Sequence, residues 1–195
     1  MKIDTPHGPA LVHLETVEHG RAALLLGHGA GGGVSAPDLV SATRAAHRAG
    51  IHVALVEQPY RVAGRRSPAP ALQLDTAWLA VASELAGGVF DGLPLIFGGR
   101  SSGARVACRS ASDGGAVGVL CLAFPVHPPG RPEKDRLGEL DAVTVPVLVV
   151  QGESDPFGRP PPASNREVVL LPGNHSLRSD RPGLEHAVQT WLTAQ

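Results

Sequence analysis

The sequence predicts an α/β protein with a mostly parallel central sheet and helices on both of its faces. Three observations lead to this prediction. Short apolar runs alternate along the chain with longer segments of helical periodicity. The runs are continuous, as expected of strands that are covered on both faces. Residues suited to chemistry follow the ends of several runs, where parallel sheets of this kind bind their ligands.

The N-terminal third of the chain supplies the first elements. Residues 1–17 alternate polar and apolar side chains around a Pro-His-Gly-Pro turn, which predicts an antiparallel hairpin at one edge of the sheet. Residues 21–26 form an unbroken apolar run and predict a buried strand. Residues 37–49 have helical spacing of apolar side chains, and Gly50 follows in the position of a C-terminal cap.

The strand–helix pattern then repeats to the end of the chain. Apolar and β-branched runs predict the remaining strands, at residues 51–56, 95–97, 117–122, 145–150 and 167–171. Helical spacing predicts the remaining helices, at residues 72–85, 102–112, 134–140 (a weak one) and 182–192. Only one short helix fits between Leu122 and Val145, so we expect no cap domain over the sheet.

Composition limits the class of protein. The chain has 195 residues, of which 43% are hydrophobic, and we expect one globular domain over residues 1–195. The net charge of −1 favours neither nucleic acid nor a membrane as partner. No apolar run approaches 18 residues, and the N-terminus lacks the apolar core of a signal peptide, so we expect a cytoplasmic protein. Cys108 and Cys121 have apolar neighbours and are expected to be reduced core thiols. The sequence indicates no particular oligomeric state.

A Gly-x-Ser-x-Gly turn at Gly99–Gly103 lies between an apolar strand and a helix. This arrangement is typical of a nucleophile elbow, in which a strained positive φ lifts the serine hydroxyl clear of both elements. Ser101 is therefore the predicted nucleophile. An ordinary glycine-rich strand–helix turn is the alternative explanation of the same pattern.

A serine nucleophile needs a base, and the base needs a carboxylate to orient it. With such an elbow the order along the chain is Ser, then Asp or Glu, then His. Asp155 and His175 follow two consecutive predicted strands in that order, whereas His127 and His186 do not fit it. Glu153 is the rival acid, and Asp155 before a proline is also a common turn residue.

Two backbone N–H groups are expected to form an oxyanion hole. One is that of Ser102, directly after the nucleophile. The other is that of Ala30, with Gly31 as the alternative, in the glycine-rich turn after residues 21–26. A phosphate-binding loop does not fit this turn because no lysine follows it as in a P-loop. The remaining histidines have no metal-ligand spacing, so we expect neither a metal nor a cofactor.

Five segments together resemble known families. Four of them resemble motifs of the α/β-hydrolase superfamily, namely Gly27–Gly31, Gly99–Gly103, Asp155–Gly158 and Gly173–Ser176. Gln58–Arg66 is similar to the dienelactone-hydrolase-like branch that contains the testis-expressed-30 and KAT8-complex-subunit-3 type proteins. The resemblance covers nearly the whole chain. It implies the α/β-hydrolase fold and catalytic roles for Ser101, Asp155 and His175.

The sequence thus predicts a serine hydrolase that cleaves carboxylic esters or thioesters of small acyl groups through an acyl-serine intermediate. A small-molecule substrate is the expected partner, and the predicted substrate-binding residues are His28, Arg61, Arg65 and Arg100. A solvated loop explains Arg61, Arg65 and Arg66 equally well, and Arg100 has an internal ion pair as its alternative role. Two other functions stay open, a non-catalytic interaction or scaffold protein and a serine acyltransferase or perhydrolase.

Overall fold

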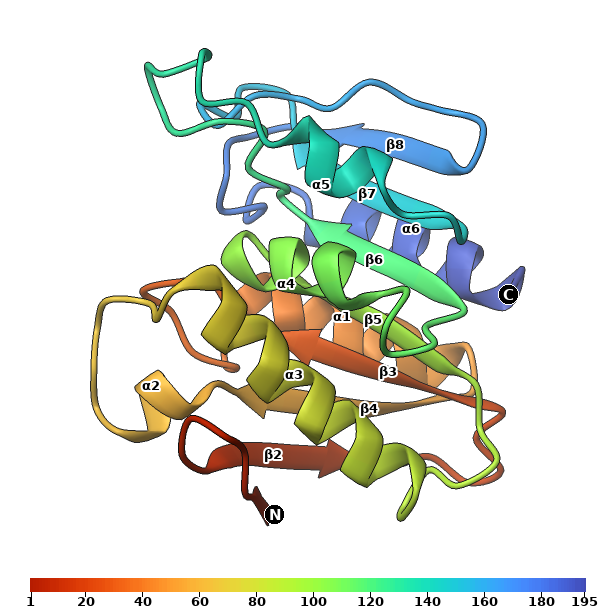
Figure 1. The fold of residues 1–195 in the computed structure, drawn as a ribbon. Helices are drawn as coiled ribbons and strands as arrows, with labels where there is room; N and C mark the ends of the chain where they lie inside the picture. The colour runs from red at the N-terminus through yellow and green to blue at the C-terminus, as the bar shows by residue number, and fades with distance from the viewer.

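The computed structural model describes residues 1–195, and its central feature is one eight-stranded sheet with the order β1-β2-β4-β3-β5-β6-β7-β8 (Figure 1). β2 pairs antiparallel with both β1 and β4, and every other neighbouring pair is parallel. The predicted mostly parallel sheet with an antiparallel hairpin at one edge is confirmed. The strands are β1 (Lys2–Ile3), β2 (Ala10–Glu15), β3 (Ala22–Gly27), β4 (Ile51–Glu57), β5 (Leu95–Arg100), β6 (Gly118–Leu122), β7 (Val147–Gly152) and β8 (Arg166–Leu171).

Helices cover both faces of this sheet. In Figure 1, α3 and α4 lie in front of the strands, while α1 and α6 lie side by side behind them. α5 packs against α4 on the front face. The helices are α1 (Pro37–Arg48), α2 (Pro59–Val62), α3 (Ala71–Ala86), α4 (Ser102–Ser110), α5 (Leu137–Asp141) and α6 (Arg181–Thr193).

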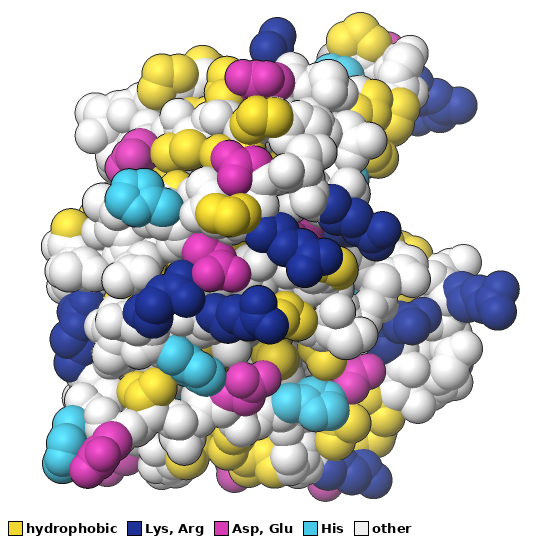
Figure 2. Space-filling model, turned by 180° about the vertical axis from the view of Figure 1, so that it is seen from behind, with side chains coloured by type: hydrophobic (Ala, Val, Ile, Leu, Met, Phe, Trp, Pro, Cys, Tyr) yellow, Lys and Arg dark blue, Asp and Glu magenta, His cyan; other side chains and the backbone are white.

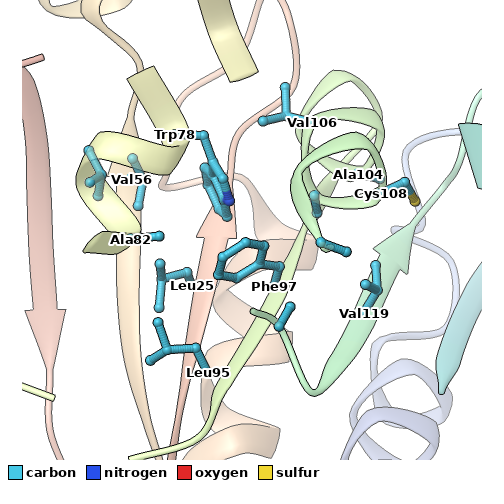
Figure 3. Packing of buried hydrophobic residues seen from close by; sticks show 14 of the residues in the cluster. Leu25, Val56, Trp78, Ala82, Leu95, Phe97, Ala104, Val106, Cys108 and Val119 are labelled. Carbon is cyan, nitrogen blue, oxygen red and sulfur yellow. The ribbon is translucent and has the colours of Figure 1, made fainter. Parts of the chain in front are cut away.

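Two apolar cores, one on each face of the sheet, explain why the strands are continuous apolar runs. Successive residues of β3 point to opposite faces, so Leu25 packs on the α3 and α4 side while Leu24 and Leu26 pack on the α1 and α6 side. On the α3 and α4 side, the rings of Trp78 and Phe97 meet edge to face with centroids 5.5 Å apart (Figure 3).

The structure differs most from the predicted elements at three places, and other ends shift by one or two residues. β5 continues to Arg100 instead of ending at Phe97, because its glycines are needed for close packing rather than for a turn. A Cβ at Gly98 would lie 2.9 Å from the Leu120 carbonyl oxygen. The short helix α2 was not predicted. α5 begins at Leu137 rather than at residue 134.

The outer face formed by α1 and α6 carries charges of both signs next to one another (Figure 2). Arg48 of α1 pairs with Glu185 of α6 at 2.8 Å, which ties the two helices together across the surface. None of the helices is both long and apolar enough to cross a lipid bilayer. Cys108 and Cys121 are buried free thiols with their sulfur atoms 3.5 Å apart.

Candidate active site

Ser101 occupies a sharp turn between β5 and α4. Its φ is +52° and its ψ is −108°, a conformation that L residues rarely adopt. The Ser101 N–H donates to the Leu122 carbonyl of β6 at 2.9 Å, which holds the turn on the sheet. A Cβ at Gly99 would lie 2.7 Å from the Gly27 carbonyl oxygen, and one at Gly103 would overlap the same peptide. Both glycines are therefore required by the close approach of β3, β5 and α4.

The structure brings Ser101, Asp155 and His175 together. His175 Nε2 lies 2.9 Å from Ser101 Oγ, and His175 Nδ1 lies 2.8 Å from Asp155 Oδ2. A carboxylate only accepts hydrogen bonds, so Nδ1 carries the ring proton and Nε2 is free to accept from the serine hydroxyl. Asp155 follows β7 and His175 follows β8, hence the carboxyl ends of neighbouring parallel strands deliver both side chains.

Hydrogen bonds besides the one to His175 hold the side chains of Asp155 and its neighbour Gln151 in place, among them one from Gln151 Nε2 to the Gly158 carbonyl at 2.8 Å. The Asp155 side chain is fully buried. Its Oδ1 accepts from the Phe157 N–H at 2.8 Å, and its Oδ2 accepts from Gln151 Nε2 at 2.8 Å. Gln151 Nε2 also reaches the Phe124 carbonyl at 3.0 Å, so the amide is itself held in place. Glu153, the rival acid, is exposed and its carboxylate has no partner.

The sequence analysis missed Gln151 and Phe157. The Phe157 ring stacks on His175 with centroids 4.0 Å apart and an interplanar angle of 27°, which fixes the plane of the imidazole. A signal for Gln151 was available, since it is a polar residue at the end of an otherwise apolar buried strand. Such a residue must find a hydrogen-bond partner within the fold.

Arg100 forms an internal ion pair, the second of the two roles considered for it. Its Nε donates to Asp38 Oδ2 at 2.7 Å, and its Nη2 donates to the His175 carbonyl at 3.2 Å. Asp38, in the first turn of α1, is buried. Burial raises the pKa of Asp38, and the positive charge of Arg100 opposes this rise without cancelling it. Arg100 thus links the start of α1 to the loop that carries His175.

The glycine-rich turn after β3 curls beside the elbow. The N–H groups of Ala30 and Gly31 have no hydrogen-bond partner in the chain. Ser102 is the first residue of α4, so its N–H has no acceptor within the helix. Tyr60 Oη donates to the Ala30 carbonyl at 2.8 Å and restrains the turn. The geometry leaves Ala30 and Gly31 both available as the second oxyanion donor.

His28 departs from its predicted role in substrate binding. It is 3% exposed, its Nδ1 donates to the Gly29 carbonyl at 2.8 Å, and its Nε2 accepts from the Gln58 N–H at 3.1 Å. Both ring nitrogens are therefore committed within the fold, and none is left for a substrate. Burial lowers the pKa of His28, which keeps the ring neutral.

The predicted arginine cluster, Arg61, Arg65 and Arg66, follows β4 and has its own contacts. Arg61 Nη1 donates to the Arg65 carbonyl at 3.3 Å, while Arg65 and Arg66 are exposed. Arg65 lines a hollow beside α2 together with His7. Exposure of Arg65 and Arg66 fits the solvated-loop alternative, whereas Arg61 is half-buried. No hydrogen bond or ion pair joins Arg61 or Arg65 to Ser101, Asp155 or His175.

The site is open to solvent. An open hollow with a mostly polar lining adjoins it, formed by Gly32, Gly33, Arg100, Ser176 and Arg178 among others. The connection between β6 and β7 contains only α5, so no cap domain covers the strand ends. No group of three or more His, Cys, Asp or Glu side chains is placed to hold a metal ion.

Solved structures with this fold extend over the whole chain. Est1E from Butyrivibrio proteoclasticus, solved with ferulic acid bound, matches with a TM-score of 0.79 and 17% identity, covering 100% of this chain and 98% of that one. XC6422 from Xanthomonas campestris, described as an α/β serine hydrolase without a lid, matches with a TM-score of 0.75 and 22% identity over 100% and 95% of the two chains. The dienelactone hydrolase from Anabaena variabilis has a TM-score of 0.74 and 16% identity, with 100% and 94% covered.

A family model gives the assignment by sequence. Residues 20–186 match the model described as an alpha/beta hydrolase domain, which is most of the chain and includes the elbow and the loops after β7 and β8. The matched region also includes the glycine-rich turn after β3. Together with the fold, this match shows that the chain belongs to the α/β-hydrolase family.

Proposed function

We propose that this protein is a serine hydrolase that cleaves carboxylic esters or thioesters of small acyl groups through an acyl-Ser101 intermediate. The observation that carries the proposal is the hydrogen-bonded chain from Ser101 Oγ to His175 Nε2, and from His175 Nδ1 to Asp155 Oδ2, at 2.9 and 2.8 Å. Both distances are within the range that proton transfer requires. The general activity of a hydrolase, without a specified substrate, follows from the family to which the chain belongs.

The first half of the proposed reaction forms the acyl-enzyme. Ser101 Oγ attacks the carbonyl carbon of the substrate while its proton passes to His175 Nε2. The imidazolium that results is stabilised by the Asp155 carboxylate through the Nδ1–H bond. His175 then gives the proton to the leaving oxygen or sulfur as its bond to the carbonyl carbon breaks. The alcohol or thiol leaves, and the acyl group stays on Ser101.

The second half uses water in place of the serine. His175 takes a proton from the water, the hydroxide attacks the acyl carbon, and the proton returns to Ser101 Oγ as the carboxylic acid leaves. In both halves the negative charge on the carbonyl oxygen is stabilised by the N–H groups of Ser102 and of Ala30 or Gly31. The open site gives water direct access to the acyl-enzyme, which supports hydrolysis over transfer to another acceptor.

We further propose that the chain is a member of the dienelactone-hydrolase-like branch. The segment Gln58–Arg66 and the short connection between β6 and β7 support this placement. An uncapped site suits small or surface-presented acyl groups.

Labelling with a fluorophosphonate probe tests the proposed function, because the probe reacts only with an activated serine. We expect the wild type to label and the Ser101→Ala variant not to label. The same variant is expected to lose at least a factor of 10³ in kcat on a short acyl ester. Ser112→Ala is the matched control, since Ser112 is exposed and lies after α4, and it is expected to label like the wild type.

Two outcomes would contradict the proposal. A wild-type protein that neither labels nor hydrolyses a panel of short esters and thioesters would point to the non-catalytic alternative. Labelling that survives in Ser101→Ala would place the reactive serine elsewhere. Adding an alcohol or peroxide as competing acceptor then separates a hydrolase from an acyltransferase or perhydrolase by the products formed.

A further inference from the structure

Gln151 is a polar side chain at the end of a strand whose preceding residues are all apolar. The strand β7 begins with Val147–Val150, and Gln151 after them is 0% exposed. A buried amide is unfavourable unless its polar atoms find partners. The amide oxygen of Gln151 has no partner. What favours a glutamine over an apolar side chain at this position is therefore its nitrogen.

That nitrogen is surrounded by acceptors. Gln151 Nε2 lies 2.8 Å from Asp155 Oδ2, 2.8 Å from the Gly158 carbonyl oxygen and 3.0 Å from the Phe124 carbonyl oxygen. An amide has only two hydrogens, so the three acceptors compete for them, and the charged carboxylate of Asp155 is the strongest of the three. A reversed amide would place an oxygen against all three acceptors, which fixes the orientation of the side chain.

The Asp155 carboxylate depends on donors within the chain. Its side chain is 0% exposed. Oδ2 accepts from Gln151 Nε2 and from His175 Nδ1, each at 2.8 Å, and Oδ1 accepts from the Phe157 N–H at 2.8 Å. Such donors stabilise a carboxylate that is removed from water. Gln151 is thus the one side chain besides His175 that donates to the oxygen facing the imidazole.

We propose that Gln151 is a positioning residue for the reaction, and that its Nε2–H group turns Asp155 Oδ2 toward His175 and keeps the carboxylate charged. The inference rests on the proposed function and adds one side chain to the groups that move the proton. A charged carboxylate in this orientation stabilises the imidazolium that forms when Ser101 loses its proton. Gln151 acts through Asp155, because it is buried and has no surface to offer a substrate.

The same donor affects the pH at which the pair of Asp155 and His175 becomes active. Without Gln151 Nε2–H, the carboxylate depends more on a protonated His175 for its stabilisation. The protonated pair, which cannot accept the proton of Ser101, is then favoured. Loss of the donor therefore moves the midpoint of the acid limb of kcat/KM to higher pH.

Other charged and titratable groups around the pair stay unchanged in this comparison. Arg100, which is paired with Asp38 of α1, donates to the His175 carbonyl. The ring of His127, after β6, lies against Gly158. Asp180 caps α6. The remaining charged side chains on the two loops that carry Asp155 and His175 are exposed, and they are Glu153, Arg159 and Arg178.

Gln151→Met tests the role, because methionine has a similar length and lacks the donor. We expect kcat on a short acyl ester, per folded molecule, to fall by about tenfold to a hundredfold while KM changes by less than about threefold. The midpoint of the acid limb of kcat/KM is expected to rise by about 0.5–1 pH unit. Steady-state kinetics between pH 5 and 9 measure all three quantities.

Asn165→Leu is the matched control. The Asn165 amide donates to two backbone carbonyls, those of Val143 at 2.7 Å and Val145 at 3.1 Å, and makes no hydrogen bond to Ser101, Asp155 or His175. Both variants are expected to lose stability in urea denaturation. Only Gln151→Met is expected to change kcat and the midpoint, because a purely structural amide affects neither.

Gln151→Glu covers the case in which methionine prevents folding. A buried carboxylic acid stays neutral up to about pH 8, and its O–H group then donates to Asp155 Oδ2 in place of the amide. We expect this variant to keep most of the wild-type kcat near pH 7. At higher pH a second carboxylate forms beside Asp155, so kcat per folded molecule is expected to fall where that of the wild type does not.

The outcomes separate the two proposals. A wild type that hydrolyses the ester, with a Gln151→Met variant that matches Asn165→Leu in kcat and in midpoint, overturns the positioning role and leaves the proposed function standing. A Gln151→Glu variant that follows the wild type at every pH does the same. A wild type that shows neither hydrolysis nor fluorophosphonate labelling overturns both.

Discussion

Two histidines at the carboxyl ends of strands differ in the partners that their ring nitrogens have. His28, after β3, is bonded on both sides to backbone groups, the Gly29 carbonyl and the Gln58 N–H. His175, after β8, is bonded to two side chains, the Asp155 carboxylate and the Ser101 hydroxyl. His28 is 3% exposed, whereas the His175 side chain is 15% exposed at the open end of the sheet.

The difference shows what separates a structural histidine from one that is able to transfer protons. A backbone N–H cannot give up its proton, so the bond that it makes to His28 Nε2 keeps that nitrogen unprotonated. A serine hydroxyl can give up its proton, and a carboxylate stabilises the cation that forms. The same side chain at equivalent positions of two strands therefore serves packing in one case and is suited to catalysis in the other.

Replacing the two histidines in turn is the strongest way to break this comparison. His175→Gln is expected to lower kcat on a short ester by about 10⁴-fold or more, because the proton acceptor is lost. His28→Asn leaves the Gln58 N–H unpaired, so we expect a loss of about 1–3 kcal/mol in the free energy of unfolding. Its kcat per folded molecule is expected to fall by less than tenfold. Steady-state kinetics and urea denaturation measure the two effects, and equal losses of kcat in both variants would refute the distinction.

The next effect concerns Arg100, which donates to the His175 carbonyl as well as to Asp38. Arg100→Met leaves the Asp38 carboxylate buried without its partner, and we expect a loss of about 3–5 kcal/mol in the free energy of unfolding. The double variant Arg100→Met/Asp38→Asn removes the unpaired charge and is expected to recover most of that stability. If the double variant is as unstable as the single one, the ion pair is not the reason for the loss.

The smallest effect is the pH dependence of stability that His28 produces. Burial lowers the pKa of folded His28 below the unfolded value of about 6.5. As the pH falls below 6.5, the unfolded chain binds a proton that the folded chain does not, so the contribution of His28 to stability is full above pH 6.5 and is lost below it. Between pH 7.5 and 5.5 we expect the wild type to lose more stability than His28→Asn, by up to about 1.4 kcal/mol per pH unit. Parallel losses in urea denaturation would contradict this explanation.

Local patterns were sufficient to predict the parallel sheet, both helical layers and the positions of Ser101, Asp155 and His175. Apolar runs identify buried strands, and the carboxyl ends of parallel strands must meet at one edge. The C-terminal end of β5 was not predictable, because its glycines are explained by contacts with β3, β6 and α4 rather than by their own neighbours in the chain.

Partners that come from distant segments were also beyond the sequence. Asp38 is 62 positions from Arg100, and nothing near either residue indicates that they meet. The backbone N–H that occupies His28 Nε2 comes from Gln58, after the next strand. A histidine after a strand therefore suggests chemistry equally well at positions 28 and 175, and only the three-dimensional partners separate the two.

The backbone contact between Gly27 of β3 and Gly103 of α4 has a consequence for the reaction itself. The two N–H groups proposed to hold the oxyanion belong to these two segments, one just beyond β3 and one at the first residue of α4. The distance between these two N–H groups is therefore set by the direct contact between the Gly27 and Gly103 backbones. A methyl group added at position 103 would push the two segments apart and increase the distance between the two N–H donors. It would slow the reaction without contacting any atom that reacts.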